Sequence, residues 1–159
     1  MGMQELKLAL DLIQRNPDRC LFAGEREETV IKLAEDALGF SFPPTYRMFL
    51  ERLGAGSFGG EEIYGVIDEN FVDSGVPDAV WTTLRGRREW GLPDQLLVVY
   101  FDGGTDYFAL DTSKRNDDDE SPVVVWHPGL SSPDSVPETV ASDFGRFLLD
   151  TVNDELVSA

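Results

Sequence analysis

Apolar residues in the first third of the chain recur every three or four positions, the spacing that places them on one face of a helix. This pattern predicts helices over Glu5–Arg15, Glu25–Leu38 and Pro44–Leu53. Gly39 follows the second apolar set, and glycine readily adopts the left-handed conformation that ends many helices. Pro44 suits the first position of the third helix, because a backbone N–H has no intrahelical partner there.

The middle of the chain changes to apolar runs separated by glycine-rich turns. Strands are predicted over Glu61–Val66, Leu96–Phe101, Tyr107–Leu110 and Val123–Trp126. The segment between the second and third runs begins Asp102-Gly103-Gly104, and such pairs tolerate the positive φ angles of hairpin turns. Six consecutive apolar residues in the second run indicate a strand that is covered on both faces.

Two further helices are predicted around these strands. One covers Pro77–Trp90, and its side chains predicted to face the core are Val80, Trp81 and Leu84. The last would use the apolar face formed by Val140, Phe144, Phe147, Leu148, Thr151 and Val152. Its start fits either Ser142 as the capping residue or Ser135 with Glu138 as a capping box. Helices, then strands, then a helix define an α+β protein, and 159 residues predict a single domain over 1–159.

The net charge of −17 is distributed unevenly. Residues 1–52 carry nine acidic and seven basic side chains, whereas residues 53–159 carry 21 acidic and six basic ones. Such a surface repels nucleic-acid phosphates and anionic membranes, and it attracts a basic protein partner. Solubility in a highly acidic proteome is an alternative explanation for the same charge.

The sequence also predicts a cytoplasmic protein. A single cysteine, Cys20, excludes an internal disulfide, as is usual in a reducing compartment. Glu5 and Asp11 interrupt the apolar residues at the N-terminus, unlike the core of a signal peptide. The longest apolar run, Leu96–Phe101, is far shorter than the ~20 residues that span a bilayer.

Three groups of residues have a catalytic or ligand-binding alternative. Asp102, Asp106 and His127 could serve a hydrolase, but the pattern favours turn and strand-end roles for the two aspartates and a structural or surface role for His127. The run 117–120, Asp-Asp-Asp-Glu, offers oxygen ligands to calcium, but contiguous carboxylates point in different directions. The glycines of 54–60 follow a helix and lack the Lys-Ser/Thr ending of a phosphate loop. We therefore expect no catalytic residues, no metal and no cofactor.

Two blocks of sequence resemble the SUKH superfamily, in particular its Smi/Knr-type domain. The first is LGFSFPPTYRMFLERLGAG at 38–56, which is similar to the family segment LG…LP..Y..FL...NGG. The second is LPDQLLVVYFDGGTDYFALD at 92–111. Trp126-His127 and the segment 142–148 are similar to a later strand and the closing helix. The resemblance covers roughly residues 25–150 and implies a central, largely antiparallel sheet with helices packed beside it.

The resemblance also implies a function. Many bacterial members look like immunity proteins that bind and neutralise toxin domains, often nucleases of polymorphic or contact-dependent systems. Such a protein would act stoichiometrically on a basic toxin domain. The contact candidates are acidic: Glu61, Glu62, Asp68, Glu69, Asp117, Asp118, Asp119 and Glu120. The alternative is a regulatory or scaffolding module of the same fold that binds a cellular protein.

Overall fold

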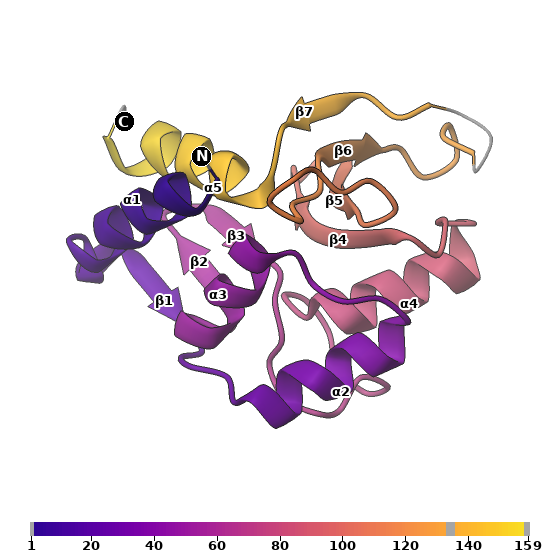
Figure 1. Cartoon of the computed structure of the whole chain (residues 1–159), viewed down its shortest axis with the longest axis horizontal. Coiled ribbons are helices and arrows are strands. Elements are labelled where there is room, and N and C mark those ends of the chain that lie inside the picture. Colours follow the sequence, from indigo (N-terminus) through magenta and orange to yellow (C-terminus); the bar gives the residue numbers. More distant parts are fainter. Residues whose placement is uncertain (1, 133–135, 158–159) are drawn as a thin grey trace.

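The computed structural model describes residues 2–132 and 136–157, and its helices follow the predicted order (Figure 1). These helices are α1 (Gly2–Gln14), α2 (Glu28–Leu38), α3 (Pro44–Arg52), α4 (Ala79–Glu89) and α5 (Phe144–Val152). Pro17–Arg19 forms a short 3₁₀ turn, and Asn153–Val157 continues α5 as a π-helical turn. Gly39 ends α2 with a φ of 88°, as its sequence predicts. The helices predicted from apolar spacing are thus confirmed, with their ends shifted by a few residues.

The strands divide between two antiparallel sheets. The first contains β1 (Cys20–Phe22), β2 (Gly56–Phe58) and β3 (Glu61–Ile63) in the order β1-β2-β3. The second contains β4 (Leu96–Phe101), β5 (Tyr107–Asp111), β6 (Val123–Trp126) and β7 (Thr139–Ala141) in the order β4-β5-β6-β7. The backbone N–H of Tyr64 donates to the carbonyl of Val99 at 2.8 Å and joins the two. This arrangement confirms the α+β class.

Three short strands were not predicted from the sequence. β1, β2 and β7 have three residues each, too few for a periodic pattern, and β2 begins at a glycine. Residues 67–72 follow the first predicted strand, Glu61–Val66, and their sequence allows either an extension of that strand or a turn; the structure shows a turn. There the side chain of Asp68 accepts a hydrogen bond from the backbone of Asn70, whose own side chain accepts from Val72 and Asp73. These local bonds hold a turn.

The starts of α4 and α5 correct two sequence predictions. α4 begins after Asp78, whose carboxylate accepts from the N–H groups of Val80 and Trp81 at 2.9 and 3.1 Å. α5 begins after Asp143, which accepts from the N–H of Arg146 at 2.8 Å, so Ser142 is not the cap. Val140 lies on β7, where 43% of the residue is exposed, and not on the apolar face of the last helix. Of the alternative capping box, Ser135 lies outside the described residues.

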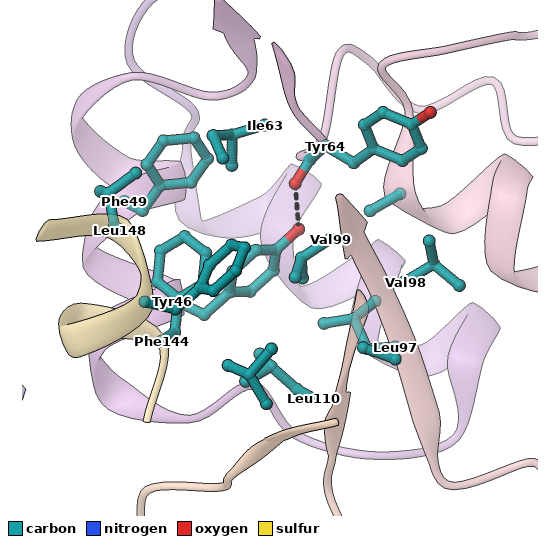
Figure 2. Close-up of a cluster of buried hydrophobic side chains, with 14 of the residues drawn as sticks. Tyr46, Phe49, Ile63, Tyr64, Leu97, Val98, Val99, Leu110, Phe144 and Leu148 are labelled. Carbon is teal, nitrogen blue, oxygen red and sulfur yellow. Dashed lines mark hydrogen bonds between the residues drawn. The ribbon is translucent and has the colours of Figure 1, made fainter. Parts of the chain in front are cut away.

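The core lies where α3 and α5 meet the two sheets (Figure 2). Tyr46 of α3 is fully buried, and its hydroxyl donates to the carbonyl of Tyr64 at 2.9 Å. Phe144 of α5 packs edge-on against Tyr46 and Phe49, with ring centroids 5.0 and 5.4 Å apart. Val99 and neighbouring residues of β4 complete this cluster. These buried aromatic residues of α3 and α5 therefore form the centre of the fold.

Candidate partner-binding surface

The predicted contact residues fall at two separate places on the molecule. Glu62, at the middle of β3, and Asp68 and Glu69, in the following loop, are exposed. The segment 117–119, between β5 and β6, is exposed as well. Asp68 and Glu69 line a hollow together with Glu25 and Glu27, which precede α2. Figure 1 places α2 at the lower edge of the view and the connection between β5 and β6 in the upper half. The structure thus offers two acidic areas rather than one continuous contact face.

Glu120 does not belong to either exposed area. Its side chain is buried, and its two carboxylate oxygens accept from the backbone N–H of Thr45 at 3.0 Å and from the Thr45 hydroxyl at 2.8 Å. Burial raises the pKa of Glu120 above its usual 4.5, and the bonds from Thr45 partly offset this effect. Because Thr45 lies in the first turn of α3, Glu120 caps that helix from a distant loop. A role in contacting a partner is therefore withdrawn for Glu120.

Glu61 is engaged within the protein as well. It is half-buried on β3 and accepts a hydrogen bond from the hydroxyl of Tyr100. Burial and this carboxylate raise the pKa of Tyr100. Tyr100 in turn stacks on Phe108 and packs against Phe147 of α5, with ring centroids 5.3 and 5.6 Å apart. Glu61 thus links β3 of the first sheet to β4 of the second.

Internal bonds order the loop that contains Asp117–Asp119. The side-chain oxygen of Asn116 accepts from the N–H groups of Asp118 and Glu120 at 2.9 and 3.0 Å. Arg115 lies 3.5 Å from a carboxylate oxygen of Asp119, which adopts a left-handed conformation with a φ of 63°. Among the described residues, no group of three or more Asp, Glu, His or Cys side chains is arranged to hold a metal ion.

The residues of the hydrolase alternative are partly brought together. A carboxylate oxygen of Asp106 contacts Nδ1 of His127, and the two side chains are 22% and 42% exposed. Asp102 instead accepts from the N–H groups of Gly104 and Asp106 at 2.8 and 3.1 Å. The bond from Gly104 is the main cause of a lowered pKa at Asp102. Asp102 therefore serves the hairpin turn, while Asp106 orients His127.

A shallow groove lies beside Glu62, Asp68 and Glu69. It consists of two hollows of about 350 and 330 Å³ that share Ile67, and we call it the Ile67 groove. The first is lined by Leu21, Phe22, Ala23, Ala55, Gly56, Ser57, Glu62, Ile67 and Pro77. The second is lined by Glu25, Arg26, Glu27, Val30, Ile67, Asp68 and Glu69. Sequence reasoning missed the apolar half of this surface, because it depends on the unpredicted strands β1 and β2.

The fold and the exposed surface together define the class of this protein. The chain is an α+β protein with a buried aromatic centre and acidic exposed loops. The model of the SUKH_6 family, described as SMI1-KNR4 cell-wall, matches residues 28–148. The chain therefore belongs to this family, which confirms the resemblance found in the sequence.

The family match begins in α2 and ends in α5, so it omits α1. α1 is nevertheless part of the core, to which it contributes Leu6, Ala9 and Ile13. None of the helices in the described part of the chain has the length and apolar composition needed to cross a membrane.

Proposed function

We propose that this protein is a non-catalytic protein-binding module, and specifically an immunity protein that neutralises a nuclease-type toxin domain. Membership of the SMI1-KNR4 family carries the proposal, because this family is generally non-catalytic and is associated with protein–protein interaction. The exposed carboxylates of Glu62, Asp68, Glu69 and 117–119 add a physical basis for binding a basic surface. We infer further that residues 1–159 form one domain that acts in the cytoplasm without a cofactor.

Electrostatics provides the mechanism for such inhibition. A nuclease needs a basic surface to hold the phosphates of its substrate. An acidic protein that covers this surface competes directly with the nucleic acid. Complementary charge also raises association rates by ~10–1000-fold at low salt, which favours capture of a toxin before it acts. Direct binding of nucleic acid or an anionic membrane by this chain is disfavoured by the same charge of −17.

Co-expression with a toxin domain encoded by an adjacent gene tests the proposal. We expect restored growth and a stoichiometric complex in a pull-down. A fourfold neutralisation, Glu62→Gln, Asp68→Asn, Glu69→Gln and Asp118→Asn, should lower the association rate about tenfold at low salt. The matched control neutralises Glu51, Asp36, Glu89 and Asp94, which are also exposed. Undiminished toxicity together with no complex would contradict immunity against that toxin.

The alternative is a regulatory or scaffolding module, and the family description, SMI1-KNR4 cell-wall, favours it. The gene neighbourhood separates the two functions: an adjacent toxin gene supports immunity, whereas its absence supports regulation. Affinity purification from the native host gives the second measurement. Recovery of a cell-envelope assembly protein, and not of a toxin, would support regulation.

A further inference from the structure

The outer face of the first sheet is open and partly apolar. Leu21, Ser57 and Glu62 are register partners across β1, β2 and β3, so their side chains share one face. Leu21 is 77% exposed at the edge of this face. On the opposite face, Phe58 and Ile63 are buried in the core. The sheet therefore presents an uncovered leucine on the same face as a carboxylate, with Ser57 between them.

The apolar surface continues beyond the sheet. Ile67 belongs to both hollows of the Ile67 groove, and it connects Leu21 and Pro77 on one side with Val30 on the other. Val76, which precedes Pro77, is 57% exposed. Apolar side chains that adjoin one another on the surface, with polar residues around them, are typical of a surface that another protein covers.

The charge around this groove indicates which kind of ligand would bind there. Five carboxylates line it, those of Glu25, Glu27, Glu62, Asp68 and Glu69, against the single guanidinium of Arg26. Arg26 is directed at backbone carbonyls, since its Nε donates to Val66 and its Nη1 to Glu25, both at 2.9 Å. The groove thus combines an apolar floor with a negative rim whose one cation is engaged internally. The complementary ligand carries apolar side chains flanked by lysine or arginine.

We propose that the Ile67 groove is the primary docking site for a basic amphipathic segment of the protein partner. Apolar residues of that segment pack on Leu21 and Ile67, and its cationic residues face Glu62, Asp68 and Glu69. This inference rests on the proposed protein-binding function and names the surface that performs it. The loop 117–119 then contributes general negative potential rather than the docking contact.

A peptide titration of the full-length, ¹⁵N-labelled protein tests the docking site directly. The probes are a short peptide of alternating lysine and leucine, its lysine–serine counterpart and its glutamate–leucine counterpart. We expect the lysine–leucine peptide to shift the amide resonances of Leu21, Ala23 and Ile67. The lysine–serine peptide should bind about tenfold more weakly, and the glutamate–leucine peptide should not bind.

Matched variants assign the binding to the groove. Leu21→Ser should weaken the lysine–leucine peptide about tenfold, whereas Leu8→Ser, at a leucine on α1 that is 57% exposed, should not. Asp68→Asn with Glu69→Gln should weaken it similarly, whereas Asp117→Asn with Asp118→Asn should have little effect. Amide dispersion in each variant's spectrum shows that the fold is retained.

Two results would overturn the docking site. One is no shift at the groove with the lysine–leucine peptide; the other is equal sensitivity to the groove and control variants. The pull-down with the toxin domain separates this failure from that of the proposed function. The complex could persist in Leu21→Ser and in the double variant at Asp68 and Glu69 but be lost in the double variant at Asp117 and Asp118. That result would support the proposed function and assign the contact to the loop 117–119.

Discussion

At the scale of the residue, Glu120 shows that tertiary contacts decide whether a carboxylate faces solvent or caps a helix. It ends the run Asp117–Glu120, yet it is 4% exposed while its three neighbours face solvent. The difference is the pair of hydrogen bonds to Thr45, which satisfy an N–H of the first turn of α3 that has no intrahelical partner. A carboxylate in this position gains two bonds but loses hydration, and burial dominates the direction of its pKa shift.

This balance predicts a pH dependence of stability. Because the pKa of Glu120 is raised in the folded state, its ionisation opposes folding as the pH rises from its usual 4.5 through the folded pKa. Glu120→Gln can accept from the N–H of Thr45 and donate to its hydroxyl, so it keeps both bonds without the charge. The stability of the glutamine variant relative to the native protein should therefore increase over this pH window. Urea unfolding at a series of pH values measures the difference.

Two controls isolate the effect of Glu120. Glu120→Ala removes both bonds and should lower the free energy of unfolding by about 1–3 kcal/mol. Asp117→Asn, at an exposed neighbour, should stay within about 0.5 kcal/mol of the native protein and show no such pH window. A constant difference between native and Glu120→Gln proteins at all pH values would contradict the raised pKa.

At the scale of the element, α1 and α5 pack through small residues. A Cβ added at Gly145 of α5 would overlap the carbonyl oxygen of Gly2 of α1, so the two backbones approach too closely for a larger side chain. Arg146 lies 3.6 Å from Glu5 along the same contact, and Arg19 beyond α1 donates to the carbonyls of Glu155 and Leu156. Both ends of α5 are therefore tied to the N-terminal segment.

Gly145→Ala should accordingly separate the two helices. Because the obstacle is backbone rather than a flexible side chain, we expect a loss of about 1–3 kcal/mol in the free energy of unfolding. Gly104→Ala is the matched control, since the nearest atom to its added Cβ is a side-chain oxygen 3.5 Å away. Equal stability of the two variants in denaturant titrations would show that α1 and α5 do not pack as closely as described.

At the scale of the whole molecule, the net charge of −17 acts against compactness. Several of the described basic side chains form local ion pairs, as in the i,i+4 pairs Arg15–Asp11, Lys32–Asp36 and Arg85–Glu89. Such exposed pairs contribute little individually. The remaining carboxylates repel one another through solvent, and dissolved salt screens this repulsion beyond about 10 Å at 0.1 M.

Raising NaCl from low to moderate ionic strength should therefore increase the Tm by several degrees. Circular dichroism melts measure the change, and KCl at equal ionic strength distinguishes screening from an effect of one cation. A variant with Asp117→Asn, Asp118→Asn, Asp68→Asn and Glu69→Gln should show a smaller salt dependence, because it carries less charge. A Tm that falls with salt would indicate that local ion pairs, rather than net repulsion, dominate the electrostatics.

Helices and strands long enough for apolar residues to recur at regular spacing were predictable from the sequence, whereas strands of three residues mostly were not. The helices from Glu5 to Leu53 and the hairpin around Gly103 follow from spacing and turn chemistry, and both are confirmed. Val140 fits the spacing of the last helix but lies on β7, because Asp143 caps that helix three residues later. Strands of three residues form only when a partner strand supplies their hydrogen bonds, and that partner is distant in sequence.

The candidate surface also contains residues that the sequence predicts and residues that it does not. Glu62, Asp68 and Glu69 were identified from the chain because charge and turn residues mark exposed positions. Leu21 was not identified, since its exposure follows from its register with Ser57. Both residues lie in strands that the sequence does not predict.

By itself, the sequence determined the periodic helices, the glycine turns, the acidic charge and the family, because each depends on neighbouring residues or on composition. Only the tertiary structure decided which carboxylates reach solvent, which strands pair and where an apolar floor meets an acidic rim. These properties depend on contacts between distant segments, such as Thr45 with Glu120 or Leu21 with Ser57. Burial changes the free energy of a charge or a leucine only after those segments have come together.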